Sequence, residues 1–170
     1  MEADPNKNYK EPDNAESLLS LIQQKTLLII ASDGSKSSKT SGGGWIIANA
    51  EGSEIITGFY PEFGDITQIN SHRAKIYGAL SVFLFLQEYC NFYRITLQSP
   101  IEYFCDNKEV VKKLLDITES NRHYYSSNSK IKDTDAVLEI QKYIPDNIKV
   151  HNVRGHQDKK KRKEQLTMVK

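Results

Sequence analysis

Residues 31–35 read Ala-Ser-Asp-Gly-Ser and close the apolar run from Thr26 to Ile30. An apolar run followed by the turn-forming residues Gly and Ser predicts a strand that ends at Asp33. The carboxylate of Asp33 would then lie at the edge of a sheet. Such an edge is a place for a metal or a phosphate. Because Asp-Gly is also an ordinary turn dipeptide, the meaning of Asp33 depends on which other side chains the fold brings to the same edge.

The composition is that of a globular domain. The chain has 170 residues, of which 38% are hydrophobic and 26% charged, which is enough for about one domain with an ordinary core. No apolar segment approaches the roughly 20 residues that span a bilayer, and residues 1–16 lack the apolar core of a signal peptide. We therefore expect an intracellular protein, nuclear or cytoplasmic, with no membrane partner. Cys90 and Cys105 predict two buried thiols rather than a disulfide framework or a metal knuckle.

Positive charge is concentrated near the C-terminal end. Residues 151–170 contain seven Lys or Arg and two Asp or Glu, whereas the whole chain has a formal net charge of +1. The run from Lys159 to Lys163 is typical of nuclear-import or nucleic-acid-contacting segments, and equally of a solvated basic loop. We predict a partly disordered lead-in over residues 1–25, one domain over residues 26–158 and a basic tail over residues 159–170.

Periodicity predicts an α/β domain. The expected strands are Thr26–Ser32, Trp45–Asn49, Glu54–Tyr60, Ile101–Cys105 and Ile148–Val153, and the expected helices are Ser71–Tyr89, Lys108–Ile117 and Thr134–Tyr143. Short turns make the first three strands an antiparallel meander, and helical crossovers return the later strands parallel to the first. The fold is thus a five-stranded mixed sheet with helices packed on it. Asp33 and Asp106 each end a strand, so they can share one cation if the two strands are neighbours. The run Gly42-Gly43-Gly44 is interpreted as a flexible strand entry.

Five short motifs follow one another along the chain. They are ASDGS at 31–35, GGGW at 42–45, SHRAKIYGAL at 71–80, FCDNKEVV at 104–111 and HNVRGHQD at 151–158. In this succession the chain resembles the ribonuclease H domains of retrotransposon reverse transcriptases, from about Thr26 to Asp158. The resemblance implies the ribonuclease H-like fold. Active members of that family hydrolyse the RNA strand of an RNA–DNA hybrid with two divalent ions, Mg²⁺ or Mn²⁺, held among four acidic residues.

The resemblance also assigns site residues. Asp33 and Asp106 match two of the metal ligands, and His156 matches a histidine associated with proton transfer or product release. Lys75 departs from the pattern. The family's motif reads Arg-Ala-Glu, in which the Glu bridges both metals, whereas this chain reads Arg73-Ala74-Lys75. An ammonium in that place repels a divalent ion, which predicts that metal affinity collapses. The family's fourth acidic residue lies beyond the segment at which this chain stops, and Asp158 is the residue nearest to standing in for it.

Three functions remain open at this point. The first, which the charge of Lys75 favours, is a degenerate nucleic-acid-binding domain that contacts RNA–DNA hybrid or RNA, needs no cofactor and has lost or impaired hydrolysis. Its expected nucleic-acid contacts are Arg73, Lys75, Arg154, Lys159, Lys160, Lys161 and Arg162. The second is an active metal-dependent endonuclease in which Asp158, Glu109 or Asp65 compensates. The third is a fragment that acts as a protein-interaction module, and the sequence leaves the oligomeric state open.

Overall fold

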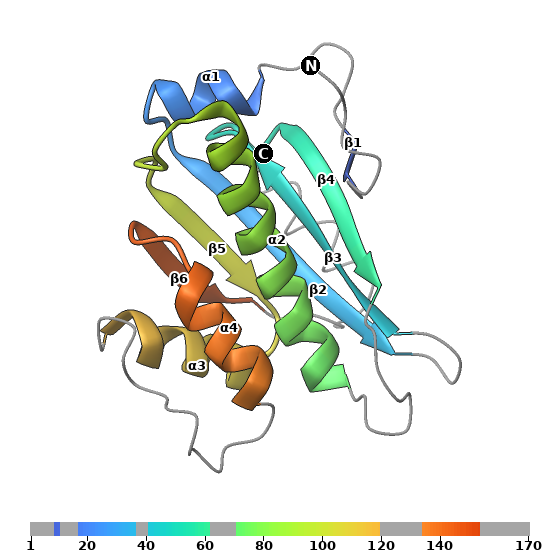
Figure 1. Cartoon of the computed structure of the whole chain (residues 1–170). Coiled ribbons are helices and arrows are strands. Elements are labelled where there is room, and N and C mark those ends of the chain that lie inside the picture. Colours follow the sequence, from blue (N-terminus) through green and yellow to red (C-terminus); the bar gives the residue numbers. More distant parts are fainter. Residues whose placement is uncertain (1–8, 11–16, 37–40, 62–70, 120–133, 154–170) are drawn as a thin grey trace.

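A mixed β-sheet with helices packed on one of its faces forms the body of the molecule (Figure 1). The computed structural model describes residues 9–10, 17–36, 41–61, 71–119 and 134–153. Its strands are β1 (Tyr9–Lys10), β2 (Leu28–Lys36), β3 (Ser41–Ala48), β4 (Glu54–Pro61), β5 (Ile101–Cys105) and β6 (Ile148–Asn152). Its helices are α1 (Leu18–Gln23), α2 (Ser71–Tyr93), α3 (Lys108–Glu119) and α4 (Thr134–Tyr143). None of these helices is long and apolar enough to cross a bilayer.

The strands lie in the order β1-β4-β3-β2-β5-β6. Neighbouring strands from β1 to β2 run antiparallel, whereas β5 pairs parallel with both β2 and β6. The predicted five-stranded mixed sheet is confirmed. The two-residue β1 adds to the edge of the sheet beside β4, within residues 1–25, for which the sequence predicts a partly disordered lead-in.

Strand β2 runs further than the sequence predicts. It continues to Lys36, and its residues Asp33 and Gly34 pair with Gly44 and Gly43 of β3. Asp33 therefore lies inside a long hairpin arm rather than at the end of a strand, and the turn interpretation of Asp-Gly-Ser is wrong. The pairing also makes Gly43 part of β3, which corrects its interpretation as a flexible strand entry.

Close packing against α2 explains why these positions are glycines. A Cβ atom on Gly34 would lie 2.1 Å from the backbone of Ala74, and one on Gly43 would lie 2.5 Å from the Cα of Gly78. Real Cβ atoms do not approach other atoms so closely, so a side chain at either position would push the helix away from the sheet. The glycines thus set the depth at which α2 crosses β2 and β3.

Helix α2 is buried along most of its length, as its apolar sequence predicts. Its side chains share one core with the inward side chains of the strands and with Leu18, Leu21 and Ile22 of α1. Trp45 of β3 packs into this core with 7% of its surface exposed. Cys90 and Cys105 are free, buried thiols, which confirms the prediction made for them.

Candidate functional site

Two carboxylates come together where β2 and β5 lie side by side. The strands are parallel neighbours with Ala31 in register with Phe104, so Asp33 lies two residues further along β2 and Asp106 directly follows β5. Parallel pairing is what places the two acids at the same part of the sheet, as the sequence predicts.

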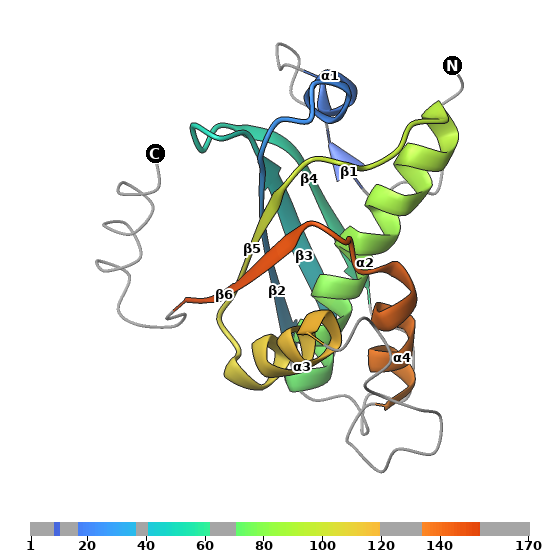
Figure 2. The same cartoon turned by 90° about the vertical axis from the view of Figure 1, so that its left-hand side faces the viewer.

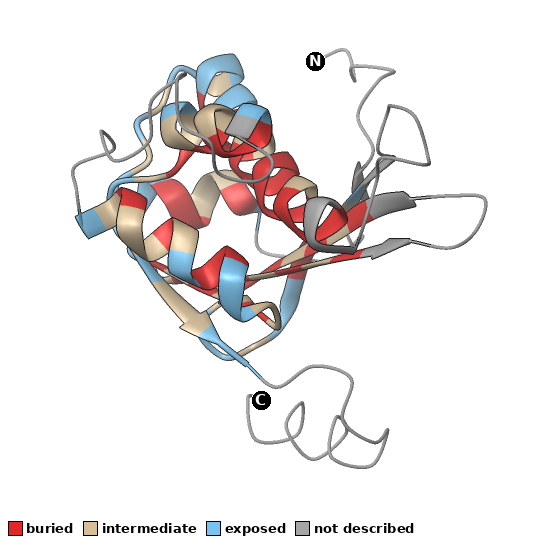
Figure 3. Cartoon of the chain, turned by 90° about the horizontal axis from the view of Figure 1, so that it is seen from below, coloured by how far each residue is buried: buried red, intermediate tan, exposed pale blue. Residues whose placement is uncertain are grey.

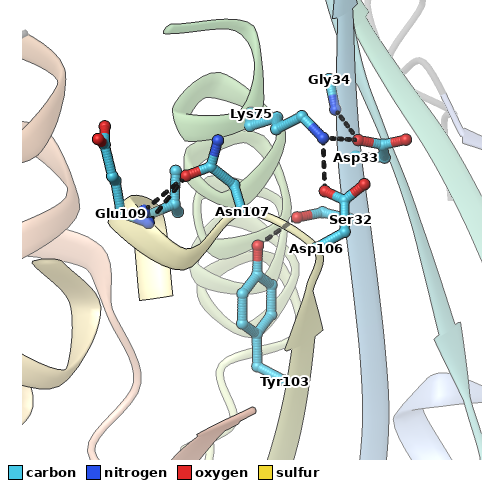
Figure 4. A network of polar contacts seen from close by, with 9 residues as sticks. Ser32, Asp33, Gly34, Lys75, Tyr103, Asp106, Asn107 and Glu109 are labelled. Atoms are coloured by element: carbon cyan, nitrogen blue, oxygen red, sulfur yellow. Dashed lines mark hydrogen bonds and ion pairs between the residues drawn. The ribbon is translucent and has the colours of Figure 1, made fainter. Parts of the chain in front are cut away.

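Lys75 reaches both carboxylates from α2. Its Nζ donates a hydrogen bond to Oδ1 of Asp106 at 2.5 Å and lies 3.2 Å from Oδ1 of Asp33 (Figure 4). The side chains of Lys75 and Asp106 are 9% and 8% exposed, whereas that of Asp33 is 47% exposed. The ammonium is therefore held between a buried carboxylate and a half-exposed one. We call these three residues the Asp-Lys-Asp cluster.

Local backbone geometry fixes both acids. The backbone N–H of Gly34 donates to Oδ1 of Asp33 at 2.9 Å. Asn107 follows Asp106 and caps α3, because its Oδ1 accepts from the backbone N–H groups of Glu109 and Val110, both at 3.0 Å. Asp106 thus lies between Cys105, the last residue of β5, and Asn107, the residue that caps α3.

The cluster keeps Lys75 charged. Burial lowers the pKa of the Lys75 ammonium, but its hydrogen bonds to Asp106 and Asp33 and the charges of both carboxylates outweigh burial and raise the pKa above 10.5. At neutral pH Lys75 therefore carries its positive charge.

These residues do not fit a divalent metal. The Lys75 ammonium occupies the space between the two carboxylates, where a shared cation would bind. In the described part of the chain, no group of three or more His, Cys, Asp or Glu side chains is placed to hold a metal ion. Glu109, one of the residues expected to compensate, points away from the cluster in Figure 4. An ammonium and a divalent ion about 4 Å apart would repel one another by several kcal/mol even with partial screening.

Solved structures share this arrangement of strands and helices. LC11-RNase H1, isolated from compost by a metagenomic approach, is 14% identical and superposes with a TM-score of 0.53, covering 83% of this chain and 92% of that one. In its structure with an RNA/DNA hybrid the TM-score is 0.54, covering 78% and 89% of the two chains. RNase H1 from the archaeon Halobacterium salinarum is 13% identical with a TM-score of 0.50, covering 76% and 86%. The chain has the ribonuclease H fold.

At this level of identity the likeness concerns the fold alone. No protein-family model matches the sequence, and no curated protein resembles it closely.

Of the remaining predicted site residues, one lies in the described part of the chain and the others lie outside it. Arg73 lies in the first turn of α2, two residues before Lys75. Outside the described residues lie Asp65, Arg154, His156, Asp158, Lys159, Lys160, Lys161 and Arg162. The expectation that Lys75 contacts phosphate is disfavoured, because its ammonium is engaged by two carboxylates in a side chain that is 9% exposed.

A buried polar pair under the cluster is missed by the sequence analysis. Ser32, which precedes Asp33, shares a short hydrogen bond with the hydroxyl of Tyr103 on β5. Tyr103 is fully buried, and burial raises the pKa of its phenol well above 10.0. The bond ties β2 to β5 next to the two acids, so these side chains help to position the cluster. Their placement on one face of two adjacent strands follows from register, which the sequence alone does not give.

Proposed function

We propose that this chain is a ribonuclease H-like domain that binds nucleic acid, RNA–DNA hybrid or RNA, and that has lost or impaired metal-dependent hydrolysis. The observation that carries the proposal is the Lys75 ammonium between Asp33 and Asp106. In two-metal hydrolysis, cations between carboxylates activate the attacking water and steady the leaving oxygen. A fixed ammonium can do neither, and it opposes the entry of a cation that could.

Support for nucleic acid as the partner comes from the fold and from charge. LC11-RNase H1, which shares the fold, has been solved in complex with an RNA/DNA hybrid. The sequence also supplies seven Lys or Arg against two Asp or Glu over residues 151–170, and basic residues attract the phosphate backbone whatever its base sequence. We assign the phosphate contacts to Arg73, Arg154 and the basic run, rather than to Lys75.

The proposal is tested by assaying cleavage and binding on the same protein. A labelled RNA–DNA hybrid is incubated with Mg²⁺ or Mn²⁺ and the native chain, Asp33→Asn, Lys75→Glu, or Lys75→Glu combined with Asp33→Asn. Lys142→Glu is a matched control, because Lys142 is exposed on α4 and pairs with Glu139 away from the cluster. Binding of the uncut hybrid is recorded in parallel by fluorescence anisotropy, at low and high salt.

We expect the native chain and Lys142→Glu to bind the hybrid in a salt-sensitive way and to leave it uncut. Cleavage gained by Lys75→Glu and removed by adding Asp33→Asn would support the assignment of the defect to Lys75. Metal-dependent cleavage by the native chain that Asp33→Asn abolishes would overturn the loss of hydrolysis. The absence of salt-sensitive binding to hybrid and to RNA would overturn the binding function.

A further inference from the structure

Helix α3 begins directly beside the Asp-Lys-Asp cluster. It starts at Lys108, two residues after Asp106, and lies at the end of the sheet where β5 ends (Figure 2). Its buried residues, which are Val110, Val111, Leu114 and Ile117, hold one side of the helix against the body of the molecule. The other side is exposed, and it is seen when the molecule is viewed from below (Figure 3). A nucleic acid that reaches the cluster would therefore pass beside the outer side of α3.

Two lysines on this outer side have no ionic partner. Lys108 and Lys112 are exposed and four residues apart, which places them one turn apart on neighbouring parts of the helix surface. Neither forms an ion pair or a side-chain hydrogen bond with any of the described residues. Glu109, Lys113 and Asp116 of the same helix do have partners. The charges left without a partner in the first two turns of α3 are thus both positive.

Folding gives no reason for a lysine at the first position of α3. The amino end of a helix carries a partial positive charge, so an acid is stabilising there and a cation is not. Asn107 already caps the helix through its own side chain. Residues that break such a local rule are expected at functional sites. The partial charge of the helix adds to the charge of Lys108, whereas Glu119 lies at the opposite end, so this end of α3 attracts an anion.

We propose that Lys108 and Lys112 bind the phosphate backbone of an RNA–DNA hybrid lying against the Asp-Lys-Asp cluster. The inference rests on the proposed function and adds two phosphate contacts from the described part of the chain. Two ammonium groups one turn apart can each neutralise a phosphate, whatever the base sequence. They supply the cations that Lys75 cannot, because its ammonium is engaged by two carboxylates.

The test measures binding of a labelled RNA–DNA hybrid to the full chain by fluorescence anisotropy, over a range of salt concentrations and without divalent metal. One variant combines Lys108→Gln with Lys112→Gln. The matched control combines Lys25→Gln with Lys142→Gln, which also removes two positive charges from exposed lysines, one preceding β2 and one on α4. Lysine acetylation with and without hybrid, measured by mass spectrometry, reports the contact at each residue separately.

We expect the Lys108→Gln, Lys112→Gln variant to bind the hybrid at least about five-fold more weakly at low salt. The slope of log affinity against log salt should fall by roughly 1–2, at about 0.9 for each lost phosphate contact. The control should bind like the native chain. The unfolding midpoint of the variant should be no lower than that of the native chain, because the substitutions remove a cation from the amino end of α3. Bound hybrid should protect Lys108 and Lys112 from acetylation and leave Lys142 reactive.

Equal losses of affinity in the variant and the control would overturn the inference, because net charge alone would then explain the binding. Unchanged affinity of the variant, or acetylation of the two lysines that hybrid does not slow, would overturn it as well. Salt-sensitive binding by the native chain beside any of these results would leave the proposed function standing. No binding of the hybrid by the native chain would overturn both.

Discussion

The two faces of the sheet are built from the same strands, yet they hold their side chains in different ways. On the helix side, α2 approaches so closely that Gly34 and Gly43 have no room for a Cβ, and Lys75 is clamped between two acids. On the open side, which no helix of the described residues covers, Phe59 is 61% exposed and His151, which stacks on Phe104, is 39% exposed. Substitutions on the helix side should therefore lower the free energy of unfolding more than those on the open side.

The largest effect is expected from Gly34→Ala. The new Cβ would lie 2.1 Å from backbone atoms of Ala74, and a helix backbone cannot yield as a flexible side chain can. We expect a loss of at least about 3 kcal/mol in the free energy of unfolding, measured by urea denaturation. Gly44→Ala is the matched control, because its nearest neighbour would be the carbonyl oxygen of Gly58 at 3.8 Å. Similar losses for the two variants would contradict the close crossing of α2.

Lys75→Met should produce the next largest effect. It keeps most of the volume of the side chain but removes the cation from Asp106, whose side chain is 8% exposed. Breaking a buried ion pair is costly, and the half-exposure of Asp33 reduces that cost, so we expect a loss of about 2–3 kcal/mol. Combining Lys75→Met with Asp106→Asn should restore much of the stability in a double-mutant cycle. Additive losses would show that the two groups do not interact.

Lys75→Glu should make the stability of the protein depend on divalent metal. The variant places a third carboxylate beside Asp33 and Asp106, a donor set that suits Mg²⁺ or Mn²⁺. Saturating metal should then stabilise the variant by about 2 kcal/mol, which is a rise of several degrees in its unfolding midpoint. The native chain should show no comparable shift in differential scanning fluorimetry. A metal-dependent shift of the native midpoint that Asp33→Asn removes would contradict the exclusion of metal by Lys75.

Tyr103→Phe probes the polar pair under the cluster. It leaves the buried Ser32 hydroxyl without the phenol, so we expect a loss of about 1–2 kcal/mol, part of which Ser32→Ala should recover in the double variant. Burial holds the pKa of Tyr103 well above 10.0 in the folded state. Its contribution to stability is thus present below pH 10.0 and is lost as the pH rises further.

Alkaline unfolding separates this contribution from that of Lys75. The pKa of Lys75 is also raised, from 10.5, so its contribution declines over a similar range. Tyr103→Phe should therefore weaken the dependence of stability on pH above about 10 without abolishing it. An unchanged pH dependence would show that the phenol is not held neutral by the fold.

The sequence predicts the architecture because each element carries its own signal. Thr134–Tyr143 has the same bounds in the structure as in the prediction, since Thr134 and Pro145 mark the limits of an amphipathic helix. The convergence of Asp33, Asp106 and Lys75 is likewise expected, because helical crossovers make β2 and β5 parallel and the resemblance places Lys75 at the metal-bridging position.

What the sequence misses depends on contacts between elements distant in the chain. Asp-Gly-Ser has the composition of a turn, but here Gly34 pairs with Gly43 within β2, and it is a glycine because α2 leaves no space for a side chain. The stacking of Phe104 on His151 depends on the register between β5 and β6, which local preferences do not encode. Tertiary packing in both places overrides the local signal.

The smallest effect on folding is expected from Glu102→Gln on the open face. Glu102 and His151 are 36% and 39% exposed and their charged atoms lie 3.6 Å apart, so the pair contributes under about 0.5 kcal/mol to folding. Urea denaturation of the variant and of the native chain measures this difference. A loss above about 1 kcal/mol would contradict the weak contribution expected of an exposed pair.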